Sequence, residues 1–305
     1  MSRGSLSVED VIRSALGPGA MVEGAEPLGG GVSAEVSRVR VALRGERREV
    51  VVRRRGPGSY WGADPARVGA EWAVYQAAAR AGIPVAEPIM CVDDADGPAA
   101  FVTGFVQGAA PITPGVLAGV VDELAAILAR IHAIPLAGLD VVQRSPAGEQ
   151  LEPPAWWRET PPTAEADRVR AILAAHPPVP IHDRRLLHGD FWPGNLLVRD
   201  GRLVAVLDWE DCLIGDPLQD VAISRLDLTW TAGTEIREQF TAAYARASGR
   251  DLSALAAWDL FAALRAAPGL DLWAPAYPKL GRPDLTVELL QSGLTGFIED
   301  AIARL

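Results

Sequence analysis

The chain has 305 residues, of which 49% are hydrophobic and 22% are charged, and its formal net charge is −10. This length suits one large domain or two lobes, and the hydrophobic fraction is sufficient for a buried core. The acidic balance argues against a protein that binds the phosphate backbone of nucleic acids, so we expect no nucleic-acid partner.

The cysteine spacing and the lengths of the apolar segments indicate the cellular compartment in which we expect the protein. The two cysteines, Cys91 and Cys212, lie far apart and form no CxxC pair, so the sequence indicates neither a disulfide framework nor a structural zinc site. The N-terminal residues lack the apolar stretch of a secretory signal, and no apolar run is long enough to span a bilayer. We therefore expect a cytoplasmic protein with no membrane partner.

The first third of the chain predicts a β-rich lobe that contains an inserted helix. Ser7 and Asp10 have the spacing of a capping box, which indicates an N-terminal helix that ends before Gly17. Short apolar runs that flank polar turns indicate two strand pairs, and Asp64-Pro65 has the pattern of an N-cap followed by a first-turn proline. The predicted elements are a helix to Leu16, strands at Val36–Val41 and Glu49–Val52, a helix from Pro65 to Arg80, and strands at Pro88–Val92 and Ala99–Phe105.

The remaining two thirds predict a mainly helical lobe. The Gly/Pro-punctuated segment Gln107–Pro114 is the candidate hinge, so we expect an N-terminal lobe at 1–106 and a C-terminal lobe at 107–305. Pro135–Pro180 reads as irregular apart from one helix. The predicted elements are helices at Val116–His132 and Glu165–Ala174, strands at Leu196–Val198 and Leu203–Leu207, and C-terminal helices broken at Gly233, Gly249 and Pro268–Pro283.

One stretch, His188-Gly-Asp190-Phe-Trp-Pro-Gly-Asn195, concentrates the polar chemistry of the chain, and Asp208 follows the next strand pair. Phosphoryl transfer needs a carboxylate that accepts the proton of the acceptor hydroxyl, and oxygen ligands that hold Mg²⁺ against nucleotide phosphates. Asp190 is the candidate base, and Asn195 and Asp208 are candidate oxygen ligands for a hard cation. The competing interpretation is an Asx-rich turn between two strands.

A glycine cluster, Gly29-Gly30-Gly31, lies in the β-like region that starts at Glu26, ahead of the strand predicted at Val36–Val41. Glycines there would let the backbone approach a polyphosphate closely, although a flexible β-turn explains them as well. The sequence contains neither a Walker A motif nor G-x-G-x-x-G. A glycine loop over strands, far upstream of an acidic loop, nevertheless fits a two-lobed kinase.

Two charged residues of the first lobe could act on a nucleotide. Arg53 ends a buried strand, where it could contact the α- and β-phosphates and pair with Glu71 on the following helix. A surface arginine and a solvated helix carboxylate are the alternatives.

Other polar residues surround the central motif. We expect His188 to shape the loop backbone rather than to transfer protons, and Asp220 either to hydrogen-bond that backbone or to be exposed. Glu210 and Asp211 are expected at the surface, and Asp216 as a helix N-cap. Aromatic and acidic residues near the C-terminus could line a cleft for a cationic or sugar-like acceptor, or could be core and solvated surface: Trp230, Trp258, Trp273, Asp259, Asp271, Asp284 and Glu288.

The assembled residues resemble the aminoglycoside phosphotransferase family, which has a protein-kinase-like fold. His188–Asn195 resembles its H-G-D-x-x-x-x-N loop, Leu207-Asp208-Trp209-Glu210 its I-D-W-E strand, and Gly215–Asp220 its G-D-P-x-x-D segment. The resemblance implies a bilobal α+β fold with a small β-rich N-lobe that has one helix and a larger, mainly helical C-lobe. ATP, with GTP as an alternative, would bind between the lobes together with Mg²⁺.

The same resemblance assigns roles to single residues. It makes Asp190 the base, Asn195 and Asp208 the metal ligands, and Gly29–Ser33 the glycine loop, with adenine contacts at Gly104 and Val106. Arg53 stands where the family has its phosphate-binding lysine. Arginine keeps the charge in a bulkier, planar group, and Lys279 is the only lysine of the chain.

The sequence thus predicts an ATP-dependent O-phosphotransferase that acts on a hydroxyl of a small molecule. An aminoglycoside-like cation is our first expectation for the acceptor, because the chain is acidic. The alternatives are a metabolic kinase for an amino alcohol, a sugar or a macrolide, and a nucleotide-binding regulator that has lost catalysis.

Overall fold

The computed structural model of the protein describes residues 6–28, 34–54, 65–141, 163–177 and 183–305. The chain divides into two compact units. Unit 1 comprises Met1–Gln107 and Gly138–Val141, and unit 2 comprises Gly108–Ala137 and Val142–Leu305. The α+β class predicted from the sequence is confirmed, because unit 1 is built on a sheet and unit 2 mainly on helices.

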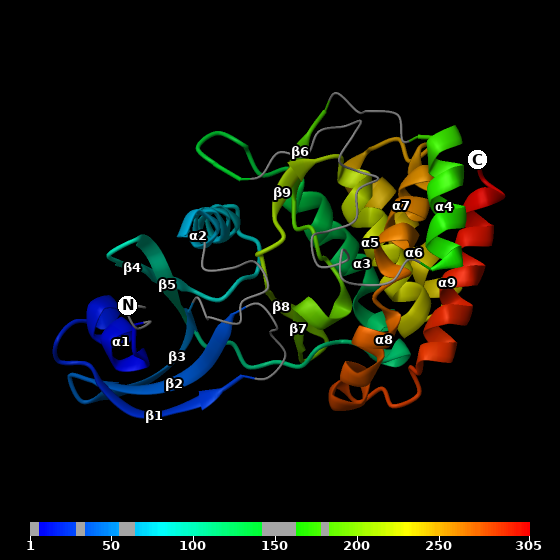
Figure 1. The fold of residues 1–305 in the computed structure, drawn as a ribbon. Helices are drawn as coiled ribbons and strands as arrows, with labels where there is room; N and C mark the ends of the chain where they lie inside the picture. The colour runs from blue at the N-terminus through cyan, green and yellow to red at the C-terminus, as the bar shows by residue number, and fades with distance from the viewer. Residues whose placement is uncertain (1–5, 29–33, 55–64, 142–162, 178–182) are drawn as a thin grey trace. The chain divides into compact units, whose positions relative to one another are not determined.

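Unit 1 contains a five-stranded antiparallel sheet with the strand order β1-β2-β3-β5-β4 (Figure 1). Two helices accompany the sheet. The elements of this unit are α1 (Val8–Leu16), β1 (Met21–Pro27), β2 (Glu35–Leu43), β3 (Glu46–Arg54), α2 (Pro65–Arg80), β4 (Pro88–Asp94) and β5 (Gly97–Gly104).

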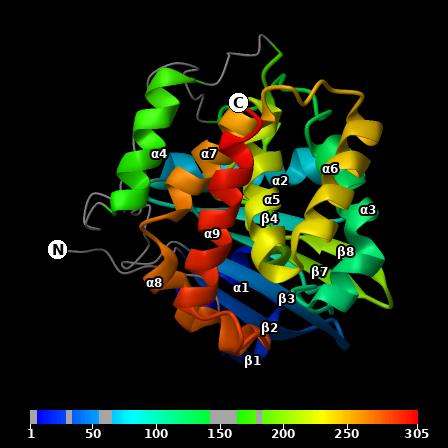
Figure 2. The same ribbon diagram turned by 90° about the vertical axis from the view of Figure 1, so that its right-hand side faces the viewer.

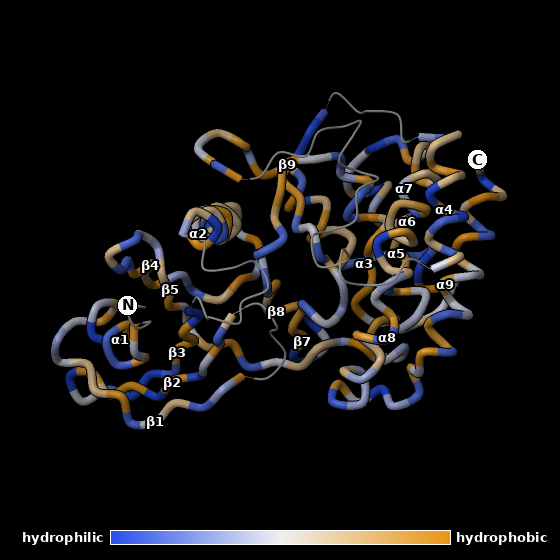
Figure 3. The backbone as a smooth tube through the Cα atoms, in the orientation of Figure 1, coloured by the Kyte–Doolittle hydropathy of each residue, from blue (hydrophilic) through white to orange (hydrophobic). Residues whose placement is uncertain are grey.

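The core of unit 1 follows from the alternation of side chains along its strands. Val39 and Val41 of β2 are buried, while Arg40 between them is exposed, and Figure 3 shows the same alternation of hydrophobic and hydrophilic colour along this strand. Val11 and Ile12 of α1 are buried in the same cluster. The amphipathic α1 therefore covers one face of the sheet, and its N-cap is Ser7, whose hydroxyl accepts the Asp10 N–H as predicted.

Unit 2 consists mainly of helices, several of which lie side by side in Figure 2. Two small antiparallel sheets, β6-β9 and β7-β8, precede the long C-terminal helices. Its elements are α3 (Pro114–Ile131), α4 (Ala164–Ala175), β6 (Arg185–Leu187), η2 (Pro193–Asn195), β7 (Leu196–Arg199), β8 (Arg202–Val206), β9 (Leu213–Gly215), α5 (Pro217–Thr231), α6 (Thr234–Ser248), α7 (Leu255–Ala266), α8 (Leu270–Trp273), η3 (Ala274–Leu280) and α9 (Val287–Ile302).

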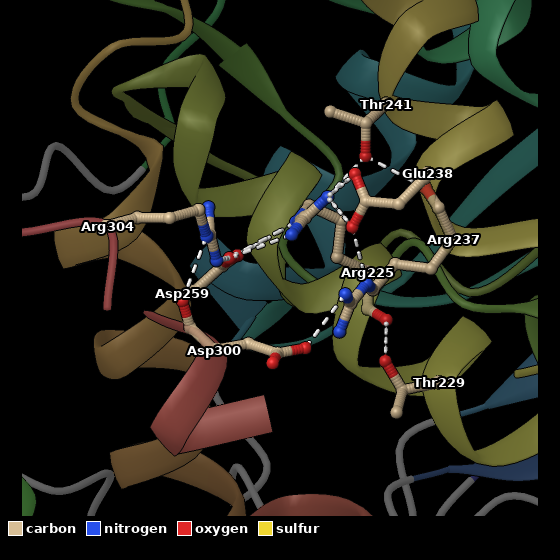
Figure 4. A network of polar contacts seen from close by, with 8 residues as sticks. All are labelled: Arg225, Thr229, Arg237, Glu238, Thr241, Asp259, Asp300 and Arg304. Atoms are coloured by element: carbon tan, nitrogen blue, oxygen red, sulfur yellow. Dashed lines mark hydrogen bonds and ion pairs between the residues drawn. The ribbon is translucent and has the colours of Figure 1, made fainter. Parts of the chain in front are cut away.

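A buried ionic network joins the helices of unit 2 (Figure 4). Arg225 of α5 is 1% exposed, and its Nε donates to both carboxylate oxygens of Asp259 on α7, at 3.1 and 3.2 Å. Arg304, just beyond α9, donates to the same carboxylate at 2.5 Å. Because each buried charge has a partner of opposite sign, the network fixes α7 against α5 without leaving an unpaired charge in the core.

Most predicted elements occur in the structure, and the differences are local. β1, β6 and β9 were not predicted, and β6 and β9 have only three residues each, which are too few to show a strand period. The segment Pro268–Pro283, predicted as a break, contains the short helices α8 and η3. Within the described ranges, no helix combines the length and the hydropathy that a membrane span requires.

The C-terminal aromatic and acidic residues favour the core interpretation over an acceptor cleft. Trp258 is buried, Trp230 Nε1 donates to the Leu290 carbonyl at 2.9 Å, and the Asp259 carboxylate is held by arginines. The exposed Asp284 accepts hydrogen bonds from Arg282. These side chains are thus engaged in packing and ion pairs.

Candidate functional site

The loop after β6 is held by the carboxylate of Asp220, which is fully buried on α5. Asp220 Oδ2 accepts the His188 N–H at 2.7 Å, and Oδ1 accepts the Gly189 N–H at 2.9 Å. His132 Nε2 lies 3.1 Å from Oδ2. Burial by itself would raise the pKa of Asp220, but the His132 contact and the loop hydrogen bonds outweigh it and lower the pKa.

Gly189 is required by the path of this loop. Its φ is +84°, and a Cβ at this position would lie 2.0 Å from the Asp211 carbonyl oxygen. Any other residue would therefore move the loop away from the segment after β8.

His188 links the loop to the end of β8. The ring Nε2 donates to the Leu207 carbonyl at 2.9 Å, and Nδ1 then accepts the Asp190 N–H at 3.3 Å, so one neutral tautomer satisfies both contacts. The fully buried ring packs on Trp209 with a centroid distance of 4.7 Å. These contacts give His188 a role in the backbone geometry of the loop.

Both oxygens of the Asp190 carboxylate accept hydrogen bonds, and the side chain remains partly exposed to solvent. Asn195 Nδ2 donates to Oδ2 at 3.0 Å and to the Asp190 carbonyl at 3.0 Å. Arg265 Nη2 donates to Oδ1 at 3.0 Å, and 30% of the Asp190 side chain is exposed. This arrangement leaves an oriented carboxylate partly open to solvent.

The pairing of β7 with β8 brings Asn195 and Asp208 to the same end of a small sheet. Leu196 pairs with Val206, and the Leu207 N–H donates to the Asn195 carbonyl at 2.8 Å. Asp208 follows with a φ of +59°, a backbone conformation that non-glycine residues seldom adopt and that tends to mark functional sites.

The donor chemistry of this pair fits Mg²⁺. The Asn195 amide nitrogen donates to Asp190, which leaves its Oδ1 as the atom for a cation, and the Asp208 carboxylate supplies further oxygen donors. In the part of the chain that the structure describes, no three His, Cys, Asp or Glu side chains form a complete metal cage. Mg²⁺ is usually held by one or two protein oxygens together with phosphates and waters, so two donors are sufficient.

Arg265, on the last turn of α7, is a site residue that the sequence did not reveal. Besides its bond to Asp190, its Nη2 lies 3.8 Å from Asp211 Oδ2. The Asp211 side chain is 28% exposed, and partial burial, followed by the charge of Asp190, raises its pKa to about 7, so it is not an ordinary solvated carboxylate. The same two causes raise the pKa of Asp227 on α5 well above its usual value.

A regular stripe on α5 faces this loop. Asp220 holds the loop amides, Ser224 Oγ donates to the Phe191 carbonyl at 2.6 Å, and Asp227 interacts with the charge of Asp190. The spacing i, i+4, i+7 puts the three side chains on one helix face. This spacing is a signal in the sequence that could have identified Ser224 and Asp227; nothing comparable identifies Arg265.

Two aromatic rings also belong to this region. Trp192 of the loop and the buried Tyr277 of η3 meet edge to face, with ring centroids 6.3 Å apart. A Cβ on Gly194 would come within 2.1 Å of the Trp192 ring. Gly194 therefore makes room for this tryptophan next to Asp190.

In unit 1 the structure brings two of the predicted nucleotide-binding residues together. Arg53 Nε lies 3.2 Å from Glu71 Oε1, and their side chains are only 14% and 9% exposed. The Gly104 N–H donates to the Glu87 carbonyl at 2.8 Å, so an adenine contact through that amide would have to break this bond. Val106 lies two residues beyond the end of β5 and is half-buried. Gly29, Gly30, Gly31 and Ser33 lie outside the described residues.

Comparisons with known proteins identify the family of this chain. The model of the phosphotransferase enzyme family (APH) matches residues 24–259. Among curated proteins, the chain is 26% identical to acyl-CoA dehydrogenase family member 11 of Rattus norvegicus over 247 residues, and 27% identical to that of Gallus gallus over 194 residues. These matches cover 70% and 57% of this chain but only 32% and 24% of the relatives, so the chain spans about a third or less of their length.

Solved structures of similar fold cover nearly the whole chain. A thermostable mutant of aminoglycoside phosphotransferase APH(4)-Ia has a TM-score of 0.63 at 20% identity, and covers 96% of this chain and 99% of its own. The macrolide 2'-phosphotransferase MphH from Brachybacterium faecium has a TM-score of 0.61 at 24% identity, with 93% and 98% covered. The protein-kinase-like fold predicted from the sequence is thereby confirmed.

Proposed function

The chain belongs to the phosphotransferase enzyme family, and on this premise we propose that it is an ATP-dependent O-phosphotransferase that acts on a hydroxyl of a small molecule. The observation that carries the proposal is the Asp190 carboxylate, partly exposed and oriented by Asn195 and Arg265. A carboxylate so placed can accept the proton of an acceptor hydroxyl within one hydrogen bond.

The position of the Asp190 carboxylate suits the following steps of phosphoryl transfer. The acceptor hydroxyl donates a hydrogen bond to Asp190, and its proton passes to that carboxylate as the oxygen attacks the γ-phosphorus. The bond from the γ-phosphorus to the β,γ-bridging oxygen breaks, ADP leaves with the electron pair, and the acceptor carries the phosphate. Because little covalent work falls to the protein in this reaction, positioning and charge dominate catalysis.

Asn195 and Asp208 would hold Mg²⁺, which when bound neutralises charge on the nucleotide phosphates. In unit 1, Arg53, held by Glu71, would contact the α- and β-phosphates in place of the lysine of the family. The 3.2 Å ion pair supports a substitution that keeps the function, rather than a regulator that has lost it. GTP would satisfy the same contacts.

For the acceptor we propose an aminoglycoside-like cation. The net charge of −10 and the partly exposed Asp190 carboxylate favour a positively charged acceptor. One solved structure of similar fold is a ternary complex of APH(4)-Ia with AMP-PNP and hygromycin B. A metabolic kinase for an amino alcohol, a sugar or a macrolide is the alternative within the same chemistry.

A coupled ADP-release screen with Mg–ATP tests this proposal. The acceptors are hygromycin B and other aminoglycosides, macrolides, choline-like alcohols and sugars, and a thermal-shift titration with Mg–ATP runs in parallel. We expect one class to stimulate ADP release and to yield a phosphorylated product. Binding of Mg–ATP without ADP release, with any acceptor or with water, would favour the regulator.

A further inference from the structure

Arg265 contacts the proposed base directly, and the phosphoryl-transfer scheme leaves open how much turnover depends on this contact. Its Nη2 donates to Asp190 Oδ1 at 3.0 Å, and 21% of its side chain is exposed. We propose that Arg265 is a positioning residue for phosphoryl transfer, which holds the Asp190 carboxylate in its reactive orientation. This inference rests on the proposed function.

The geometry shows why one donor would be insufficient. Asn195 binds Oδ2, and with this bond alone the other oxygen could swing about the Cβ–Cγ axis of Asp190. Arg265 binds Oδ1 from another element and thereby removes this freedom. Each carboxylate oxygen retains a second lone pair, so an acceptor hydroxyl can bind without displacing either donor.

The charges around Asp190 make a cation necessary. Asp211 lies 3.8 Å from the Arg265 guanidinium, and Asp227 interacts with both Asp190 and Arg265. Asp208 and Glu210 add further negative charge near Asp211. Without Arg265, the Asp190 carboxylate would lose the cation that compensates its charge among these acidic groups, and it could turn out of line with an acceptor.

Two features of the fold, the end of helix α7 and the buried ionic network, stabilise the position of Arg265. Its position on the last turn of α7 puts a cation at the negative end of the helix dipole. About a turn and a half earlier in the same helix, Asp259 is bound to Arg225 of α5, the helix that also carries Asp220, Ser224 and Asp227 (Figure 4). The buried ionic network therefore fixes the register at which α7 presents Arg265 to Asp190.

The first test uses steady-state kinetics with Mg–ATP, with hygromycin B as the acceptor and water as the alternative acceptor. The variants are Arg265→Ala, Arg265→Lys and the exposed control Arg246→Ala, which removes the same charge. We expect kcat to fall about 100-fold in Arg265→Ala with KM for ATP little changed, since a small misplacement of a catalytic group has this cost. Arg265→Lys should be intermediate, and Arg246→Ala should match the wild type.

Chemical rescue separates positioning from a merely structural role. Guanidinium chloride at non-denaturing concentration should restore kcat of Arg265→Ala about tenfold, whereas urea, which has a similar shape and no charge, should not. Undiminished kcat in Arg265→Ala overturns the inference. So does a loss of kcat that neither guanidinium nor the lysine variant recovers.

The second test does not depend on turnover. A double-mutant cycle of Asp190→Asn and Arg265→Ala on the thermal midpoint should be non-additive, because each variant removes the same contact. An additive cycle in an active enzyme overturns the inference and leaves the proposed function intact. A non-additive cycle in a protein that phosphorylates no acceptor overturns the proposed function, and the positioning role falls with it.

Discussion

At the scale of the residue, the candidate site contains the carboxyl groups of Asp190, Asp211 and Asp227 near the guanidinium group of Arg265. Asp190 is oriented by Asn195 and Arg265, while partial burial and the charge of Asp190 raise the pKa values of Asp211 and Asp227. The Asp190 and Asp211 side chains are 30% and 28% exposed, so the two carboxyl groups differ in their partners rather than in their exposure. Such separation of carboxyl environments is common where proton transfer occurs.

The raised pKa of Asp211 predicts a pH dependence of stability. Its folded value of about 7 exceeds the ~3.9 of an unfolded chain, so between these values the folded protein retains a proton that the unfolded chain has lost. This contribution to stability is complete below the unfolded pKa and disappears as the pH rises through about 7. In metal-free protein, we expect the thermal midpoint of Asp211→Asn to fall less steeply than that of the wild type across this range. Asp271→Asn, an exposed control, should follow the wild type, and parallel curves for all three would refute the assignment.

At the scale of the element, α5 organises the site. Its first turns present Asp220 to the His188 and Gly189 amides, then Ser224 to the Phe191 carbonyl, and then Asp227 to Asp190. The helix begins with the predicted N-cap Asp216, whose Oδ1 accepts the Leu218 N–H at 2.9 Å. A single helix therefore determines the backbone path of the loop and part of its charge environment.

Asp220→Asn tests this organisation. The carboxylate accepts at both oxygens, whereas the asparagine amide would direct an N–H₂ group at one of the loop amides. We expect a loss of about 3 kcal/mol in the free energy of unfolding, because a buried donor loses a charged partner. We also expect reduced turnover in the protein that remains folded. Chemical denaturation measures the change, with the exposed Asp251→Asn as control, and a loss below about 0.5 kcal/mol would contradict this role.

The elements of the fold were more predictable from the sequence than the contacts of the site. Amphipathic periodicity, capping residues and turn residues indicated α1, the β2–β3 hairpin and α3, because these signals are local. Arg265 escaped prediction since its importance arises from the packing of α7 against α5, which no local pattern encodes. The contacts of His132 with Asp220 and with the Tyr244 hydroxyl likewise arise from the packing of helices that lie far apart in the sequence.

At the scale of the whole molecule, the chain combines two units with separate contributions. Unit 1 contains the paired Arg53 and Glu71, and unit 2 contains Asp190, Asn195, Asp208 and the helix α5 that contacts their loop. The family match extends over residues 24–259 and thus includes parts of both units. The α9 helix lies beyond that match, yet the ion pair of the adjacent Arg304 with Asp259 ties the C-terminal segment to α7.

The measurement that tests the central claim most directly is product formation by Asp190→Asn with Mg–ATP and the acceptor that the screen identifies. The substitution keeps the shape of the side chain and removes the proton acceptor. We expect turnover to fall by about 10²–10⁴-fold, the range attributed to general-base catalysis, while the thermal shift induced by Mg–ATP persists. Turnover close to that of the wild type, measured as phosphorylated acceptor, would contradict the assignment of Asp190 as the base.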